Sequence, residues 1–135
     1  MFVVDASVTL AWCFEDETSA AAEAALAAFA DEEAIAPAIW PFEVANAIRT
    51  AERRGRLELS DVARVRSLLL ALPIEIEATD LGAALGEVAE VARTLDLSAY
   101  DAAYLSLAAR RGIPVATVDD RLRRAAVAAG VPLVG

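Results

Sequence analysis

The stretch SAYDAAYLSLAARRG, residues Ser98–Gly112, runs directly into IPVAT, residues 113–117, and indicates how this chain folds. Its alanines and leucines recur at helical spacing, so we predict a helix that packs into a core. Gly112 stands where a glycine commonly ends a helix, and a short β-branched run, Val115–Thr117, follows it. A buried helix that leads into an apolar strand is typical of a parallel sheet. One carboxylate, Asp101, stands in the first turn of this apolar helix.

The same alternation of helical and β-branched segments continues along the chain, and it favours parallel strands covered by helices on both faces. At 135 residues the chain has the length of one ordinary domain, so we expect a single domain spanning residues 1–135. The expected strands are Phe2–Val4, Ala34–Ala36, Ile74–Ile76, Val115–Thr117 and Pro132–Val134. The expected helices are Ser7–Phe14, Thr18–Ala30, Pro41–Arg54, Ser60–Leu70, Leu81–Leu95, Ser98–Arg111 and Arg121–Ala129.

The composition indicates in which compartment the protein is expected. Hydrophobic residues make up 58% of the chain, yet the longest uncharged apolar runs, residues 34–42 and 125–135, are short and contain proline or glycine. We therefore expect no membrane span, and no signal peptide because Asp5 interrupts the apolar opening and no basic region precedes it. The single Cys13 cannot form an internal disulfide, which favours the reducing cytoplasm.

Two absent residue types limit the chemistry. The sequence has no histidine, and all twelve of its basic residues are arginine, so lysine is absent as well. Histidine general bases, histidine-ligated zinc, lysine Schiff bases and the P-loop lysine are therefore excluded. Carboxylates, hydroxyls, arginines and any metal that the carboxylates bind remain available for catalysis.

The net charge of −9 is unevenly distributed. Residues 1–48 contain nine acids and no base, whereas residues 49–135 contain twelve acids and twelve arginines. A strongly acidic protein repels nucleic acid, which counts against an RNA or DNA substrate. The arginines gather in two stretches, however, residues 49–66 and 110–124, and each stretch could form a local phosphate-binding patch.

Four acids stand where ligands bind in an open parallel sheet, at the carboxyl ends of strands and the first turns of helices: Asp5, Glu43, Asp101 and Asp119. Each has an ordinary structural explanation, because acids stabilise the first turn of any helix by roughly 0.3–1 kcal/mol. Asp80 also follows an expected strand, so position alone does not establish function. Asp5, Glu43 and Asp101 differ from Asp80 in lying within apolar sequence, where a carboxylate is costly unless it is compensated.

Carboxylates brought together at one edge of a sheet repel one another. Two of them about 4 Å apart repel by roughly 4 kcal/mol at an effective dielectric constant near 20. A proton, an arginine or a divalent cation could offset that energy, and Mg²⁺ prefers a few carboxylates together with its own waters. Such an ion would also activate water and stabilise charge on a phosphoryl oxygen, which points to phosphodiester hydrolysis without histidine.

Three segments in this order resemble the PIN-domain ribonucleases, and most closely the VapC-type toxins of toxin–antitoxin pairs. They are VVDASV (residues 3–8), PFEVANAI (residues 41–48) and LSAYDAAYLSLAARRGIPVATVDDRL (residues 97–122), and the likeness covers essentially the whole chain. The resemblance implies a doubly wound three-layer α/β/α sandwich around a parallel sheet of order 3-2-1-4-5. It also implies a pocket that binds Mg²⁺ or Mn²⁺ and cleaves RNA.

The resemblance assigns roles to particular residues. Asp5, Asp101 and Asp119 are expected to bind the metal, directly or through waters, and Glu43 to orient or deprotonate the attacking water. Further expected contributors are Ser7 and Thr117 as hydroxyls lining the pocket, Asp96 as an accessory acid, and Arg49 and Arg53 as phosphate contacts on the helix of Glu43.

The expected partners are the RNA substrate, a cognate antitoxin protein and a second copy of the chain, with no membrane. Family antitoxins lie across a hydrophobic groove, for which the aromatic candidates here are Trp12, Phe14, Trp40 and Phe42. Two alternatives stay open. A PIN-like module could serve only as a binding or scaffolding subunit, and another doubly wound family could transfer phosphoryl groups, although the phosphatases and receiver domains concerned rely on a lysine that this chain lacks.

Overall fold

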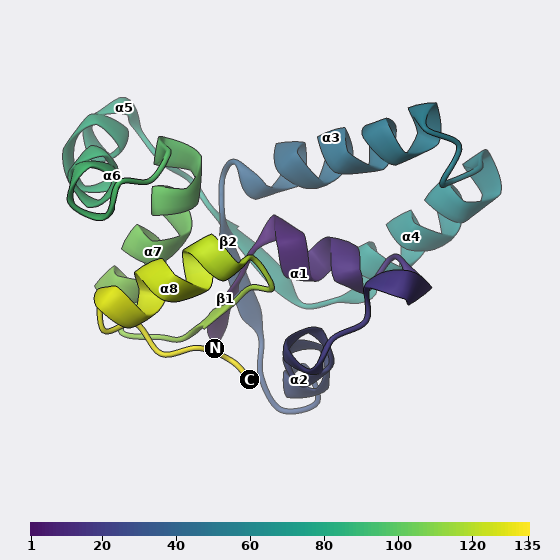
Figure 1. Cartoon of the computed structure of the whole chain (residues 1–135), viewed down its shortest axis with the longest axis horizontal. Helices are drawn as coiled ribbons and strands as arrows, with labels where there is room; N and C mark the ends of the chain where they lie inside the picture. Colours follow the sequence, from purple (N-terminus) through teal and green to yellow (C-terminus); the bar gives the residue numbers. More distant parts are fainter.

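A computed structural model describes all 135 residues and contains a parallel sheet of order β3-β2-β1-β4 at the centre of the chain (Figure 1). The strands are β1 (Phe2–Val4), β2 (Ala34–Pro37), β3 (Ile74–Glu77) and β4 (Val115–Ala116). Val3 pairs with Ile35 on one side and with Val115 on the other. The expected α/β class and the order of the first four strands are confirmed.

The expected fifth strand, Pro132–Val134, is wrong as a strand. Only one isolated bridge forms there, between Val115 and Leu133. The Val115 N–H donates to the Pro132 carbonyl at 2.9 Å, and the Val134 N–H donates to the Val115 carbonyl at 3.0 Å. Proline has no N–H to extend the ladder, and β4 offers only two residues, so pairing stops after a single step.

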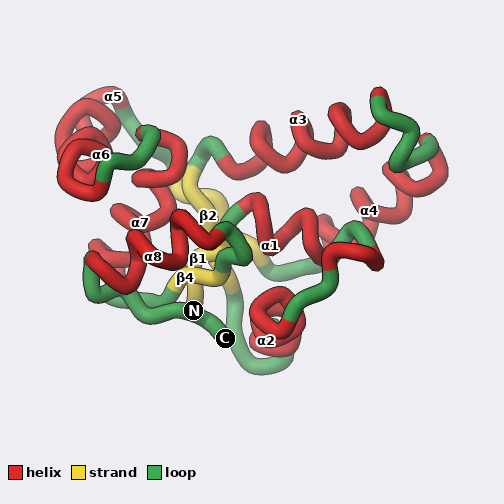
Figure 2. The backbone as a smooth tube through the Cα atoms, viewed as in Figure 1, coloured by secondary structure: helices red, strands yellow, loops and turns green.

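Helices cover both faces of the sheet. The helices are α1 (Ala6–Ala11), α2 (Ala20–Ala28), α3 (Trp40–Arg53), α4 (Leu59–Ala71), α5 (Leu81–Ala83), α6 (Ala89–Leu95), α7 (Ala99–Arg111) and α8 (Asp120–Ala128), with a 3₁₀ turn at Glu15–Glu17 and a π-helical segment at Ala84–Val88. α7 packs on β1 and β2, α8 lies on the same side of the sheet, and α1 and α2 lie on the opposite side (Figure 2). No helix combines the length and the apolar character that a membrane span requires.

Three of the expected helices differ from the structure by more than one residue at an end. The helix expected at Ser7–Phe14 ends at Ala11, and a 3₁₀ turn follows at Glu15–Glu17. The helix expected at Thr18–Ala30 begins only at Ala20, because the Ser19 hydroxyl accepts the N–H of Ala22 and caps the helix there. The helix expected at Leu81–Leu95 is divided into α5, the π-helical segment and α6. Gly82 and Gly86 lie in that division, and glycine lowers the preference for a regular α-helix.

β1, β2 and β4 are buried because helices cover both faces of the sheet, while the edge strand β3 stays partly exposed. Phe2, Val3 and Val4 have no exposed surface, and α7 contributes Leu105 and Leu107 to the same core. The strands are short and parallel, so their carboxyl ends lie together, and the first turns of α1, α3, α7 and α8 gather near that edge (Figure 1). α3 and α4 extend outward from this body as a helical hairpin (Figure 1).

Candidate active site

Asp5 follows β1 directly and caps α1. Its carboxylate accepts the Val8 N–H at 2.9 Å and the Ser7 hydroxyl at 2.8 Å, and only 4% of the residue is exposed. Burial raises the pKa of Asp5 to about 6. Hydrogen bonds from Thr117, the Val8 N–H and Ser7 oppose this rise, and the charge of Asp119 adds a smaller contribution to it. A carboxylate is therefore held in a place that disfavours its charge.

Two hydroxyls connect Asp5 to Asp119. The Ser7 and Thr117 hydroxyl oxygens lie 3.1 Å apart, and Thr117 also accepts the Asp119 N–H at 3.1 Å. Since Ser7 donates its proton to Asp5, Thr117 donates to Ser7. The Asp119 carboxylate accepts the Leu122 N–H at 3.1 Å and caps α8, with the rest of the side chain toward solvent. The expected hydroxyls therefore lie between two of the expected acids.

Glu43 is held by a tyrosine of another helix. It lies in the first turn of α3, and the buried Tyr104 of α7 donates its hydroxyl proton to Glu43 Oε1. Burial raises the pKa of Tyr104, and the charges of Glu43, Asp5 and Asp101 raise it further. Three of the four predicted acids therefore lie near one phenol, which stays protonated and serves as a hydrogen-bond donor.

Asp101 is half-buried in the first turn of α7, where Ser98 caps the helix by accepting the Asp101 N–H at 3.1 Å. Burial raises the pKa of Asp101, the charge of Asp119 raises it as well, and the Arg121 guanidinium opposes both. The carboxylate forms no ion pair. Asp101 and Asp5 are thus each coupled to Asp119.

None of the four acids forms an ion pair within the chain. Every ion pair of the chain lies elsewhere, and none involves Asp5, Glu43, Asp101 or Asp119. No three acidic or cysteine side chains stand close enough to hold a metal by themselves. Mg²⁺ is usually held by one or two carboxylates together with waters and substrate phosphates, and all donors here are carboxylate or hydroxyl oxygens. The donor set therefore fits Mg²⁺ or Mn²⁺.

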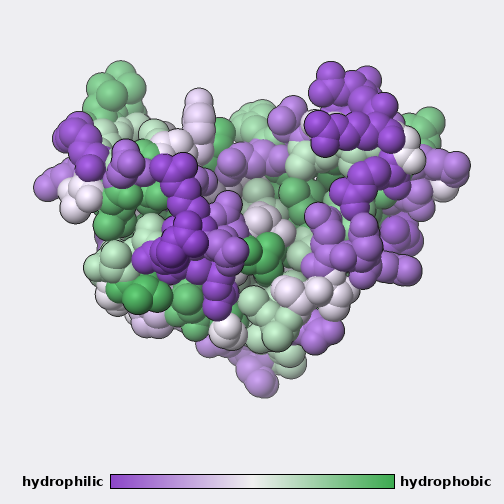
Figure 3. Space-filling model, in the orientation of Figure 1, coloured by the Kyte–Doolittle hydropathy of each residue, from purple (hydrophilic) through white to green (hydrophobic).

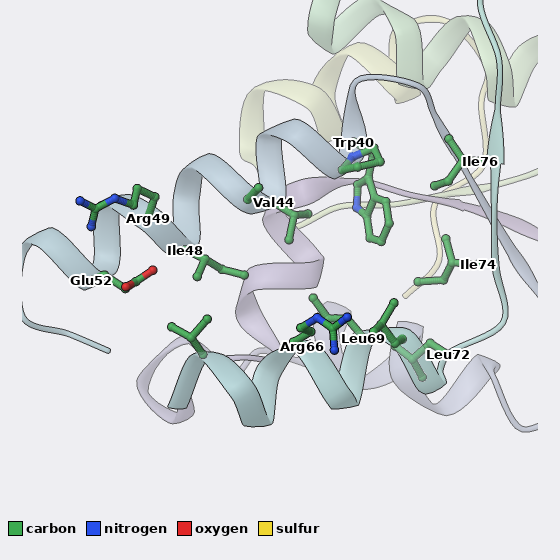
Figure 4. Close-up of a pocket in the computed structure, with 14 residues that line it drawn as sticks. Trp40, Val44, Ile48, Arg49, Glu52, Arg66, Leu69, Leu72, Ile74 and Ile76 are labelled. Atoms are coloured by element: carbon green, nitrogen blue, oxygen red, sulfur yellow. The ribbon is translucent and has the colours of Figure 1, made fainter. Parts of the chain in front are cut away.

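The other predicted residues lie around this cluster. Asp96 ends α6 with φ of 53°, and its carbonyl accepts an Arg121 N–H at 2.8 Å, while its carboxylate makes no hydrogen bond. Arg49 and Arg53 are exposed on α3, about 9 and 15 Å along the helix axis from Glu43 at 1.5 Å per residue. Arg49 lines a groove between α3, α4 and β3 (Figure 4). Both arginines stay predictions.

Tyr104 and Arg121 belong to the site but were not predicted from the sequence as site residues. Tyr104 follows Asp101 by three residues, so the two share one helix face, and that spacing was the available signal. Within an apolar helix it was indistinguishable from a core residue. Arg121 belongs to an arginine stretch that was noted only as a possible patch, and its partner lies 25 residues away in sequence.

An apolar groove of about 640 Å³ lies between α3, α4 and the edge strand β3 (Figure 4). Its apolar lining includes Trp40, Val44, Ile48, Leu69, Leu72, Ile74 and Ile76, and Arg49, Glu52 and Arg66 add charge. The Trp40 indole N–H donates to Thr9 at 3.1 Å, and the Thr9 hydroxyl donates to the Asp5 carbonyl at 2.7 Å. A chain of buried contacts thus connects the groove to the acidic site.

The other aromatic candidates do not line this groove. Trp12 packs against Phe29, and the Arg56 guanidinium lies over the Phe14 ring. Phe42 is 73% exposed on α3. Of the four candidates, Trp40 alone contributes to the groove lining.

Comparison with known proteins identifies the family of this chain and solved structures with a similar fold. The family model of the PIN domain matches residues 2–128, and no curated protein matches the chain. Among solved structures, PAE2754 from Pyrobaculum aerophilum is 25% identical with a TM-score of 0.69, over 92% of this chain and 78% of that one. VapC20 of Mycobacterium tuberculosis, a sarcin–ricin loop cleaving toxin, is 15% identical with a TM-score of 0.64, over 93% of this chain and 95% of that one. At that identity VapC20 supports the fold alone.

Proposed function

Since this chain belongs to the PIN-domain family, a family of nucleases, we propose that it is a metal-dependent endoribonuclease and the toxin of a toxin–antitoxin pair. The RNA substrate puts this activity in the cytoplasm. We also propose that residues 1–135 act as a single catalytic domain.

One observation carries the proposal: four acids from separate helices come together, and no arginine pairs with any of them. If these carboxylates only capped helices, each would need nothing beyond its local N–H, as Asp80 does with the Ala83 N–H at 2.8 Å. Asp5 is instead buried beside the charge of Asp119, which raises its pKa. An arrangement of that kind fits a site that receives an external cation.

Asp5, Asp101 and Asp119 are the residues that would hold Mg²⁺ or Mn²⁺, in part through waters, since no three acidic side chains stand close enough to bind one ion by themselves. When bound, the ion supplies charge stabilisation at phosphorus and a more acidic water. Ser7 and Thr117 fix the Asp5 carboxylate, since both take part in the hydroxyl chain that ends on it. Buried hydroxyls that are themselves hydrogen-bonded hold such a side chain in one orientation.

Glu43 is the residue that orients or deprotonates the attacking water. Tyr104 occupies Oε1 as a donor, which leaves Oε2 free to accept a proton from water. The chain has no histidine or lysine to act as the acid–base pair that attack by a 2′-hydroxyl would use. Hydrolysis by water in line with the leaving oxygen would therefore yield a 5′-phosphate and a 3′-hydroxyl.

The testing experiment incubates the purified chain with folded RNA in Mg²⁺ or Mn²⁺, with and without EDTA. We expect cleavage with metal, none with EDTA, and 5′-phosphate ends on the products. Asp101→Asn should lose cleavage, while Asp80→Asn, an exposed cap on another helix, serves as the matched control. RNA that binds yet stays intact with metal would contradict the nuclease and favour a binding module.

The antitoxin would bind the groove between α3 and α4. The groove is apolar over most of its lining, and it is bounded by the hairpin of α3 and α4 and by the edge strand β3 (Figure 4). An amphipathic helix presents apolar anchors at i, i+3 and i+4 that suit such a groove. Arg49, Arg66 and Glu52 form no ion pairs within the chain, so charged groups of the partner could pair with them.

Ala45→Arg tests this assignment because Ala45 lines the groove yet is exposed, so the fold tolerates a larger side chain there. We expect it to weaken co-purification with the small protein encoded alongside this chain. Ala27→Arg, exposed on α2, is the matched control. Equal binding by both variants would contradict the groove as the partner site. Light scattering of the purified chain tests the expected dimer.

A further inference from the structure

One arginine stands beside the acidic site without being neutralised by it. Arg121 lies in the first turn of α8, two residues after Asp119, and its guanidinium donates to the Asp96 carbonyl at 2.8 Å. It forms no ion pair with any carboxylate. Figure 3 shows hydrophilic side chains gathered over α8 on this face of the molecule.

The anchoring carbonyl is held by an unusual backbone conformation. Asp96 is the only residue other than glycine with positive φ, at 53°, and it ends α6. The Leu97 N–H returns to the Ala92 carbonyl at 2.9 Å and completes this end of the helix. The Asp96 carbonyl is thereby left free for a partner outside its own helix, and Arg121 takes it.

The remaining donors of the guanidinium are unused. Arginine has five N–H donors, and the Asp96 carbonyl takes one of them. Arg110 and Arg111, in contrast, are both committed to Glu77, at 2.5 and 3.0 Å. The bond to Asp96 places this guanidinium between the first turn of α8, which Asp119 caps, and the start of α7, where Asp101 lies in the first turn. Arg121 is thus a fixed cation at the edge of the acid cluster with most of its donors available.

We propose that Arg121 binds a non-bridging oxygen of the RNA phosphate at the acidic site. This assignment rests on the proposed nuclease function and names a substrate-binding residue for it. A planar guanidinium matches two phosphate oxygens at once, and anchoring by a carbonyl limits the side-chain freedom lost on binding. It also explains how a chain of net charge −9 offers RNA an attractive contact beside four carboxylates.

The test compares Arg121→Ala and Arg121→Lys with Arg64→Ala, an exposed arginine of α4 that pairs with no acid. A charged hydrogen bond contributes enough that its loss should lower kcat/KM about 10- to 100-fold, mostly through KM. Lysine should recover only part of the loss, because it keeps the charge without the planar fork. Arg64→Ala should stay within about twofold of the unchanged chain.

The salt dependence of kcat/KM separates a phosphate contact from a structural role. Losing one contact to single-stranded RNA should reduce the slope of log kcat/KM against log salt by about 0.7. An Arg121→Ala variant that cleaves within twofold of the unchanged chain, or that loses activity with the slope unchanged, overturns the assignment. If the unchanged chain cleaves no RNA with Mg²⁺ or Mn²⁺, the proposed function fails instead.

Discussion

Replacing Asp5 by asparagine should stabilise the metal-free protein at neutral pH. In the folded state burial raises the pKa of Asp5 to about 6, compared with 3.8 for a free side chain. The native state therefore binds this proton more tightly than the unfolded state does, so the free energy of unfolding falls as pH rises from about 4 to 6 and stays lowered above that. A difference of about two pKa units corresponds to about 3 kcal/mol.

Asparagine does not titrate, so Asp5→Asn lacks this loss. Its amide oxygen can still accept the Val8 N–H that now caps α1, which keeps the helix start intact. Any fixed cost of the new amide is the same at every pH and cancels in a comparison. The advantage of Asp5→Asn over the unchanged chain should therefore grow by about 2.5 kcal/mol between pH 4 and pH 8.

Urea denaturation in EDTA, followed by circular dichroism at several pH values, measures this difference. Asp80→Asn is the matched control, since Asp80 also follows a strand and caps a helix, but is exposed. It should change the free energy of unfolding by less than about 0.5 kcal/mol throughout. If the curves of Asp5→Asn and the unchanged chain run parallel from pH 4 to pH 8, the buried carboxylate has no electrostatic cost, and the main support for a cation site is lost.

Three further outcomes follow from the same site. Saturating Mg²⁺ at pH 8 should raise the free energy of unfolding, by about 2.7 kcal/mol at 100 times Kd, and clearly less in Asp5→Asn, as thermal melting would detect. Asp101→Asn should lose RNA cleavage in a gel assay while urea denaturation finds the fold equally or more stable, since burial and Asp119 already disfavour its charge. Tyr104→Phe keeps the ring but removes the donor to Glu43, so kcat should fall about tenfold and stability by about 1 kcal/mol; an unchanged kcat would remove Tyr104 from the site.

The fold was predictable where local pattern and global arrangement agree. The alternation of helices and strands predicted β1 to β4. β1, β2 and β4 are buried and form short apolar runs, whereas the edge strand β3 alternates isoleucine with glutamate and is partly exposed. The fifth strand was wrong because Pro132–Val134 has a strand-like composition, while pairing depends on an N–H group that Pro132 lacks and on the length of β4. The composition of a segment indicates whether it can form a strand, but pairing also depends on the strand beside it.

The acids of the site could be predicted from the order of strands and helices, but the contacts between distant helices could not. Asp5 and Asp119 were found because the topology brings the carboxyl ends of β1 and β4 together, which the order of the segments implies. Tyr104 was not found, since its partner Glu43 is 61 residues away and nothing near Tyr104 in sequence indicates that pairing. Long-range contacts between helices follow from packing angles that a pattern of residue types does not encode.

The carboxylates at two strand ends make the strongest argument for an external cation. Glu77 ends β3 and is met by Arg110 and Arg111, whose hydrogen bonds hold its pKa below the usual value. Asp5 follows β1, is more deeply buried, and has no arginine, so its pKa rises to about 6. Two arginines thus pair with Glu77 at the edge of the sheet, whereas the more deeply buried Asp5 at the centre of the sheet has no arginine partner. Folding alone would favour the opposite, because a buried charge benefits most from a partner. We infer that the uncompensated position at β1 is kept for a ligand that neutralises it.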